Sequence, residues 1–240
     1  MTIRIAVLNL QSGVATTRGY WQYATTGWKY FLPHSSRPLR LAGQMLRAES
    51  IDIALCTEVT ESSLRSGFSS QIKTIQKASG IEHAHFFPAV NTSFVQEGSA
   101  ILCKHPIIEA RTHPLTSGKM QRILAETIVR LEGKNVRIFI AHLALNTKIR
   151  RMQIEEIAVI VTKVAEPCIL GGDFNESDSR NFKQITDLGF TDISLPNFPS
   201  WKPKRALDHI FTRGFEIQDF RIPGGEIFSD HLSLVATLYF

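Results

Sequence analysis

CILGGDFN, residues 168–175, marks the end of a buried strand and sets the layout expected for the whole chain. Its apolar start predicts a short strand, and its two glycines allow the backbone to lie close to a neighbouring group. Asp173 and Asn175 are two residues apart, so in extended geometry both side chains point to one side. A carboxylate that binds a proton or a cation, next to an amide that donates to an anion, suits phosphoester hydrolysis. An ordinary strand-to-loop turn has the same short pattern.

Five other apolar runs also carry a polar residue at or near one end. In chain order these are Asn9 in the run 3–10, Glu58 after 51–57, His142 after 136–141, Asp208 in 206–211, and Asp230 with His231 before the last strand. Strands interrupted by only a few helices, with polar residues gathered at strand ends, predict two packed sheets with helices outside. Expected helices are Leu39–Ser50, a segment from Ser62 or Ser63 to Lys77, Lys148–Val164 and Arg180–Leu188.

The order of these motifs resembles the endonuclease/exonuclease/phosphatase superfamily, the DNase I-like phosphoesterases. The matching order is N, E, H, GDxN, LDxIF and SDH, and it extends over almost the whole sequence. The resemblance implies an α/β fold, a four-layer α/β-β/α sandwich of two mixed β-sheets flanked by helices. With no linker-like stretch, residues 1–240 are expected to form a single domain. The implied reaction is attack of water on phosphorus, aided by one Mg²⁺ ion that Mn²⁺ can replace.

The resemblance also implies how the metal and the acid–imidazole pair are held. Glu58 is the expected metal ligand, and Asn9 and Asp230 match the residues that hold the same ion directly or through water. Asp208 and His231 match the pair in which a carboxylate fixes one ring N–H and leaves the other nitrogen facing the reaction.

Three more residues match catalytic positions of the superfamily. His142 resembles the histidine that hydrogen-bonds a phosphate oxygen or protonates the leaving group, and its presence argues against a dedicated abasic-site enzyme. Asp173 would orient or deprotonate the attacking water, and Asn175 would hold the phosphoryl oxygens. The sequence leaves open whether Asp173 or His231 is the general base.

Residues 11–37 are the part of the chain that these motifs do not explain. The stretch holds six aromatic residues and several cations and has no acidic residue. A connection this long is usually functional or disordered, and the aromatic content argues against disorder. One interpretation is a small satellite cluster packed under the loop. The other is an arm in which Trp21, Trp28, Lys29 and Tyr30 bind the substrate.

Composition narrows the choice of substrate without deciding it. The formal net charge is +5 and the sequence pI is about 9.2, which permits a polyanionic partner. Together with cations just before Asp208, this favours a nuclease that acts on DNA or RNA. The alternative is a phosphatase or phosphodiesterase on phosphoinositide or sphingolipid headgroups, where the anionic lipid headgroup is the partner. A scaffold without activity is disfavoured, because all eight expected metal-binding and catalytic residues are present.

The sequence contains no pattern typical of secretion or membrane insertion. No apolar run approaches the roughly 18 residues of a spanning helix, and the first residues read as a strand rather than a signal peptide. Cys56, Cys103 and Cys168 each lie in an apolar run and have no metal-binding spacing, which is typical of buried thiols. We therefore expect a monomeric cytoplasmic protein.

Overall fold

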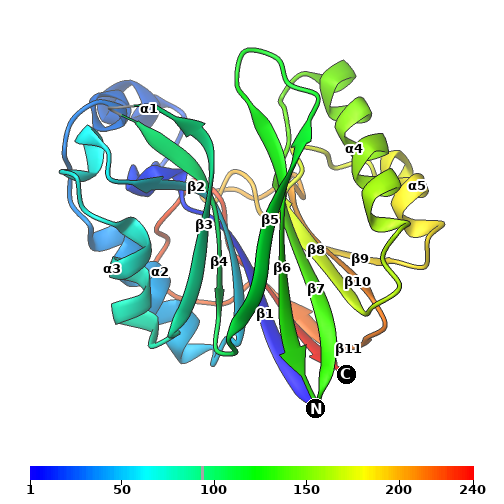
Figure 1. Cartoon of the computed structure of the whole chain (residues 1–240). Helices are drawn as coiled ribbons and strands as arrows, with labels where there is room; N and C mark the ends of the chain where they lie inside the picture. The colour runs from blue at the N-terminus through cyan, green and yellow to red at the C-terminus, as the bar shows by residue number, and fades with distance from the viewer. Residues whose placement is uncertain (93–94) are drawn as a thin grey trace.

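The computed structural model describes residues 1–92 and 95–240, and in these the strands form two six-stranded sheets (Figure 1). The first sheet contains, in spatial order, β11 (Glu216–Arg221), β12 (Leu234–Tyr239), β1 (Thr2–Asn9), β2 (Ile53–Glu61), β4 (Gln96–Cys103) and β3 (His83–Asn91). The second contains β5 (Ile107–Leu115), β6 (Arg122–Leu131), β7 (Lys134–His142), β8 (Cys168–Asp173), β10 (Asp208–Arg213) and β9 (Thr191–Ser194). The sequence did not predict β9.

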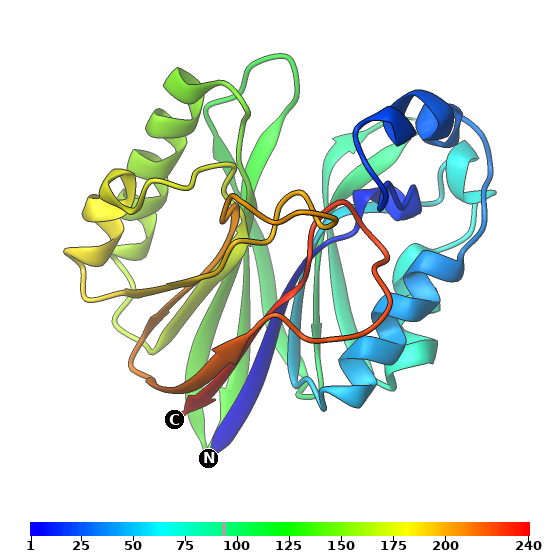
Figure 2. The same ribbon diagram turned by 180° about the vertical axis from the view of Figure 1, so that it is seen from behind.

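Helices cover the outer face of each sheet (Figures 1 and 2). Those beside the first sheet are α1 (Trp21–Thr26), α2 (Arg37–Ala48) and α3 (Gln71–Ser79), with the short 3-10 helices η1 (Gln11–Gly13), η2 (Gly27–Tyr30) and η3 (Leu64–Ser66). Those beside the second are α4 (Thr147–Val161), α5 (Lys183–Thr186) and the 3-10 helix η4 (Ser179–Phe182). None of the described helices is both long and apolar enough to cross a lipid bilayer.

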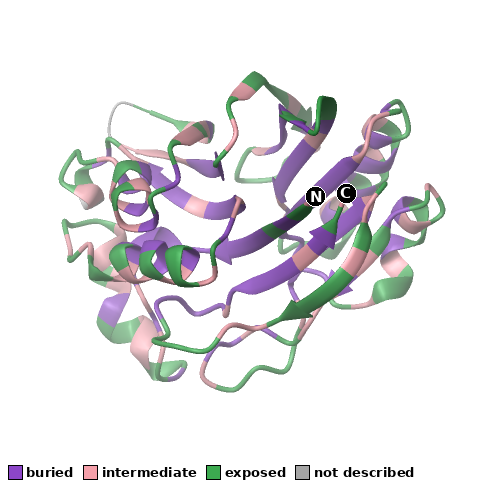
Figure 3. Cartoon of the chain, turned by 90° about the horizontal axis from the view of Figure 1, so that it is seen from below, coloured by how far each residue is buried: buried purple, intermediate pink, exposed green. Residues whose placement is uncertain are grey.

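Alternation along the strands explains the layers. In β1, Ile3, Ile5 and Val7 enter the core between the two sheets, whereas Ala6 and Leu8 pack in the cluster beneath α2 and α3. Successive side chains of a strand point to opposite faces, so one strand supplies two cores. A third cluster lies between the second sheet and α4 with α5. Figure 3 shows the resulting buried centre and exposed helix surfaces. This is the four-layer sandwich that the resemblance implied.

Each sheet contains one parallel pair, and these pairs position the site. β1 runs parallel to β2, and β7 runs parallel to β8; every other pairing of these strands is antiparallel. Parallel strands end at the same edge of a sheet, so Asn9 pairs with Thr57 and His142 pairs with Asp173. The ends of four strands therefore lie at one edge of the sandwich.

The predicted helix from Ser62 or Ser63 to Lys77 is wrong at its start. Ser63 instead caps the short turn η3, which ends at Gly67 in the left-handed conformation. The helix proper, α3, begins after Ser70, whose side chain accepts a hydrogen bond from the backbone N–H of Lys73. A serine N-cap competes equally well at several positions in such a serine-rich stretch, and the glycine decides between them.

Residues 11–37 are structured rather than extended. They contain η1, α1 and η2 and lie against the end of the first sheet where β1 finishes (Figure 2). The expectation that their aromatic content opposes disorder is confirmed.

Candidate active site

The sequence predicted Glu58 just after a strand, but the residue lies inside β2. The pairing of β2 with β4 shifts between Cys56 and Val59, and Glu58 occupies this bulge with a φ of 52°. A positive φ is strained for a residue other than glycine, and bulges of this kind re-aim a side chain. The bulge directs Glu58 toward the end of β1, where Asn9 lies.

Asn9 links two carboxylates through its amide nitrogen. Its Nδ2 donates to Glu58 Oε1 at 3.0 Å and to Asp173 Oδ2 at 2.9 Å. Its Oδ1 accepts from the backbone N–H of Gln11 at 2.9 Å. Asn9 therefore holds the two carboxylates in place, and its expected role in holding the ion directly or through water stays a prediction.

The GDxN segment is held by the loop that follows β7. Asp173 Oδ1 accepts from the backbone N–H of Asn175 at 2.9 Å, and Asn175 Nδ2 donates to the carbonyl oxygen of Leu143 at 3.0 Å. Asn175 has a φ of 52°, a conformation that asparagine tolerates better than most residues. These bonds fix Asn175 beside the strand end that carries His142.

His142 faces both carboxylates as a neutral imidazole. Its Nε2 lies 3.8 Å from Asp173 Oδ2 and 4.0 Å from Glu58 Oε1. Burial, helped by the positive charge of Arg122, holds the pKa of His142 well below its usual value. A neutral ring can offer a nitrogen lone pair to a cation.

Asp208 and His231 form the expected pair. Asp208 Oδ2 lies 2.7 Å from His231 Nδ1 and also accepts from Asn197 Nδ2. The other ring nitrogen, Nε2, lies 3.9 Å from Asp173 Oδ2. Burial opposes the charged ring, but the carboxylates of Asp208 and Asp173 outweigh it and raise the pKa of His231 to about 10. Asn197 was not anticipated, because only the folded chain brings its loop to β10.

Asp230 is tied to the segment 11–37. Its Oδ2 accepts a 2.6 Å hydrogen bond from the hydroxyl of Tyr23, and its Oδ1 accepts from Ser229 Oγ at 3.2 Å. Tyr23 had not been singled out in the sequence. It lines the same open pocket as Glu58 and Asp173.

The four residues expected to bind substrate lie outside the lining of this pocket. Trp21 and Trp28 are exposed. The hydroxyl of Tyr30 accepts from Gln11 Nε2 at 3.2 Å, and Lys29 Nζ donates to the carbonyl oxygen of Val14 at 2.9 Å. Contact between these residues and a substrate stays a prediction.

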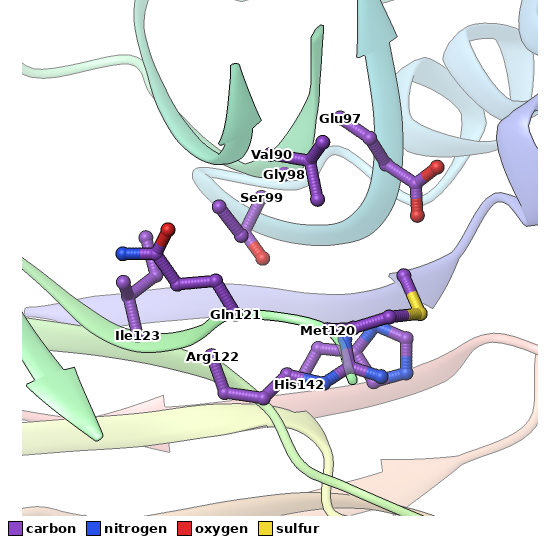
Figure 4. A pocket seen from close by; sticks show the side chains of 10 residues that line it. Val90, Glu97, Gly98, Ser99, Met120, Gln121, Arg122, Ile123 and His142 are labelled. Carbon is purple, nitrogen blue, oxygen red and sulfur yellow. The ribbon is translucent and has the colours of Figure 1, made fainter. Parts of the chain in front are cut away.

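The pocket has a volume of about 410 Å³ and contains a cation that the sequence did not reveal. Arg122, the first residue of β6, lines it together with Met120, Glu97 and His142, and the four also line the adjoining recess (Figure 4). Burial lowers the pKa of Arg122, although the charge of Glu58 opposes this. Its guanidinium makes no hydrogen bond to the part of the chain that the structure describes. The one sequence signal is a cation at the start of a buried strand, which is common.

A buried ion pair supports the loops after β7 and β8. Arg150 donates to Glu176 Oε2 from Nε at 3.3 Å and from NH2 at 3.1 Å. Its NH1 donates to the carbonyl oxygens of Ala144 and Leu145 at 3.2 and 2.8 Å. Gln153 Oε1 accepts from the Ala144 N–H at 2.8 Å. One face of α4 therefore holds the chain on either side of His142 and Asn175.

The donor set fits a divalent cation. Glu58, His142 and Asp173 each offer one ligand atom, and these atoms all lie within 4.8 Å of one another. Burial and the nearby charge of Asp230 raise the pKa of Glu58 to about 7, which reflects negative charge that lacks compensation. Carboxylate oxygens are the ligands that Mg²⁺ and Mn²⁺ favour, and imidazole is acceptable to the latter. This group shares Glu58 with the expected set, in which the other members were Asn9 and Asp230.

Comparison with known proteins identifies the family of the chain. The sequence model described as the Endonuclease/Exonuclease/phosphatase family matches residues 8–231. No curated protein matches the sequence significantly.

Solved structures share the fold at low identity. An endonuclease/exonuclease/phosphatase from Beutenbergia cavernae DSM 12333 has a TM-score of 0.76 at 19% identity, covering 99% of this chain and 71% of that one. The mannosyl-6-phosphatase of Bacteroides thetaiotaomicron VPI-5482 has a TM-score of 0.72 at 17% identity, covering 99% and 100%. The human Nocturnin catalytic domain has a TM-score of 0.73 at 18% identity, covering 100% and 93%. The family match extends over nearly the whole chain, and the chain therefore belongs to the endonuclease/exonuclease/phosphatase family.

Proposed function

We propose that this protein is a divalent-metal-dependent phosphodiesterase. The observation that carries the proposal is the convergence of carboxylates, two imidazoles of opposite charge preference and the guanidinium of Arg122 in one open pocket. An acid–imidazole pair or a carboxylate cluster alone is common in proteins. Their combination around a space large enough for a phosphoester, with a cation available for its oxygens, is what hydrolysis at phosphorus requires.

Glu58, His142 and Asp173 would hold the ion, with Asn9 fixing the two carboxylates. A bound Mg²⁺ or Mn²⁺ ion neutralises charge on the phosphate oxygens. Arg122 adds a second positive charge on the same side of the pocket, and a guanidinium donates readily to phosphate oxygens.

Asp173, in addition to holding the ion, would act on the water and the proton together with His231, Asp208 and Asn175. Asp173 Oδ2 lies almost equally far from His142 Nε2 and His231 Nε2, at 3.8 and 3.9 Å. A water between these groups would donate to Asp173, which orients or deprotonates it. Asp208 keeps His231 in a fixed orientation, with Nε2 directed at the reaction, and Asn175 has a second amide hydrogen for a phosphoryl oxygen.

The first candidate substrate is a nucleic acid strand. Lys202, Lys204 and Arg205 are exposed on the loop before β10, and Arg205 lines the pocket. Cations in a row beside a phosphate-binding site suit a polymer with regularly spaced charges. The protein would then be a nuclease acting on DNA or RNA.

The second candidate is a phosphodiester or phosphomonoester in a lipid headgroup, including phosphoinositides and sphingolipids. The observation that favours it is the exposure of large apolar side chains around the pocket mouth, including Met120 and Leu145. A purely nucleic acid-binding rim has no need of aliphatic side chains.

Hydrolysis of bis-p-nitrophenyl phosphate tests the proposed chemistry without assuming a natural substrate. After chelation we expect no hydrolysis, and Mg²⁺ or Mn²⁺ should restore it. Glu58→Gln should lower kcat/KM about 100-fold or more, the usual effect of losing one charge-stabilising group at a reacting centre. Glu109→Gln, which alters an exposed ion pair on β5, is the matched control and should behave as the parent. Undiminished hydrolysis in excess chelator would refute the proposal.

Plasmid DNA, a single-stranded oligonucleotide and short-chain phosphoinositides then separate the two substrate candidates. The natural class should show a kcat/KM well above that of the chromogenic diester, because binding energy from remote parts of a substrate lowers the barrier.

A further inference from the structure

An exposed apolar surface lies outside the catalytic cluster and has no role in it. We call it the apolar corner; it consists of Tyr20, Trp21, Trp28, Phe31 and Leu32, which are between 50% and 73% exposed. All five lie within thirteen residues that fold as α1, η2 and their flanks. A soluble protein rarely exposes so many large apolar side chains together unless the surface meets another apolar phase. We propose that the apolar corner docks this protein on an anionic lipid bilayer, with the catalytic pocket facing the headgroups.

The corner adjoins the pocket directly. Tyr23 of α1 lines the pocket and donates to Asp230, so α1 forms part of its wall. The ring of Tyr20 meets the ring of Trp201 edge to face, with centroids 5.2 Å apart and planes at 88°. The corner is therefore fixed against the loop that carries Arg205, at the pocket rim.

Apolar side chains are also exposed on the opposite rim. Met120 and Leu145 both line the pocket, and they are 46% and 79% exposed. They belong to the β5–β6 and β7–α4 loops, which rise at the same end of the sandwich as α1 (Figure 1). A flat apolar phase that contacted both rims would cover the pocket mouth, as interfacial catalysis on a membrane requires.

The charges around the corner fit an anionic surface. Residues 11–37 contain no acidic residue. Arg18 on one side and Lys202, Lys204 and Arg205 on the other are exposed, and within the described residues none of the four forms an ion pair. Aromatic and aliphatic side chains beside unpaired cations are the composition of surfaces that insert into anionic interfaces.

Other occupants explain the surface less well. In a symmetric contact between two copies the same patch meets itself, so the cations would face one another. A nucleic acid strand could stack on the rings, but Leu32, Leu145 and Met120 offer neither a stacking face nor a hydrogen bond. A bilayer accommodates both kinds of side chain. The inference deepens the proposed function toward a lipid phosphoester as substrate and depends on it for that point only, since docking is measured without turnover.

Sedimentation with lipid vesicles tests the docking. The full chain should bind vesicles that contain phosphatidylglycerol and should bind much more weakly to pure phosphatidylcholine. Replacing Phe31 and Leu32 together by serine should weaken binding at least about 100-fold, since burying one such side chain is worth roughly tenfold or more. The control replaces Phe220 and Tyr239 by serine; both are partly exposed, on the edge strand β11 and at the end of β12, away from the mouth. It should bind as the parent does.

Four further measurements make the result decisive. The double variant should keep the parent's melting temperature and its hydrolysis of bis-p-nitrophenyl phosphate, because it touches no residue assigned to catalysis or substrate binding. If the parent does not bind anionic vesicles, or if the double variant binds them equally well, the proposal is wrong. If the double variant instead loses binding to a single-stranded oligonucleotide, or changes from dimer to monomer, the corner serves nucleic acid or self-association and the membrane proposal fails. Vesicle binding without any diester hydrolysis would refute the proposed function while leaving the docking intact.

Discussion

Replacing Gly172 by alanine is the most direct test of how the strand at residues 168–173 builds the site. Gly172 has a φ of +131°, and a Cβ at this position would lie 2.0 Å from the carbonyl oxygen of Ala141. The obstacle is backbone of the neighbouring strand β7, which cannot rotate away as a side chain can. To admit a methyl group, β8 must separate from β7 where Gly172 pairs with Ala141, one residue before the pair of His142 and Asp173.

Two effects lower the expected free energy of unfolding of Gly172→Ala, and the structure distinguishes them. Holding an alanine at this φ costs about 1–3 kcal/mol, and forcing a methyl group into a packed contact adds about 1–3 kcal/mol. Together they predict a loss of about 2–6 kcal/mol in the free energy of unfolding, against a total of about 5–15 kcal/mol for a typical protein. Separating the strands also moves His142 from Asp173, and a displacement near 1 Å at a reacting centre lowers turnover about 100-fold.

Urea unfolding and bis-p-nitrophenyl phosphate hydrolysis measure the two effects. Gly189→Ala is the control for φ alone, because its φ is +83° and the nearest atom, Arg213 Cδ, is 3.8 Å away. Gly27→Ala is the control in which neither effect operates, because Gly27 is helical and no atom lies within 4 Å of the added Cβ. This substitution should be neutral or stabilising by up to about 1 kcal/mol. We expect stability to decrease in the order Gly27→Ala, Gly189→Ala, Gly172→Ala. A Gly172→Ala protein as stable as the Gly189→Ala protein, with full activity, would refute the reasoning.

Three other variants follow from the same geometry. Asp208→Asn removes the charge that orients His231, so kcat should fall about 100-fold or more in a variant that still folds; equal activity across pH 5–10 would exclude the pair from the mechanism. Arg122→Gln should lower kcat/KM on the chromogenic diester about 10- to 150-fold, the worth of a hydrogen bond to a charged group, while Mn²⁺ affinity in calorimetry stays the same; lost metal binding would contradict this. His209 is buried against Asp192. The hydrogen bond and the charge of Asp192 outweigh burial and raise the pKa of His209. A raised pKa stabilises the folded protein below the unfolded-state pKa of about 6.5, and this stabilisation is lost as pH rises through the folded-state pKa. Asp192→Asn should therefore destabilise the protein more at pH 6 than at pH 9 in urea unfolding.

Short apolar runs with polar residues at one end predicted two packed sheets with helices outside, and the family resemblance implied the four-layer sandwich. Such a run can be buried on both faces, and a polar residue at its end must find solvent, a partner or a ligand. When six runs end this way, placing the polar ends at one edge of the sandwich lets them act as partners for one another. The pattern marked the strand ends that carry Asp173, Asp208, His231 and His142, the resemblance implied their roles, and the structure brings them together.

The details that could not be predicted from the sequence depend on the register between strands. Glu58 was expected after a strand, yet it lies within β2 at a bulge. A bulge adds one residue to one strand opposite another, so it is a property of the pair β2 and β4 and leaves no mark in β2 alone. Arg122 was missed for a related reason: its position at the start of β6 is ordinary until the fold places that start beside His142.

The segment 11–37 shows why composition alone could not decide between a packed cluster and a substrate arm. Both interpretations describe part of it. The hydroxyls of Tyr23 and Tyr30 have partners inside the molecule, Asp230 and Gln11, whereas the rings of Trp21 and Trp28 remain exposed. A phenol can bury its ring edge while its hydroxyl meets a polar partner, the acceptor Asp230 for Tyr23 and the donor Gln11 for Tyr30. The acceptor for Tyr23 lies 207 residues further along the chain, and no local pattern can show which ring will reach it. Once these two tyrosines are anchored, the tryptophans are left on the outer side of α1 and η2, and the surface that we propose for membrane docking follows from that division.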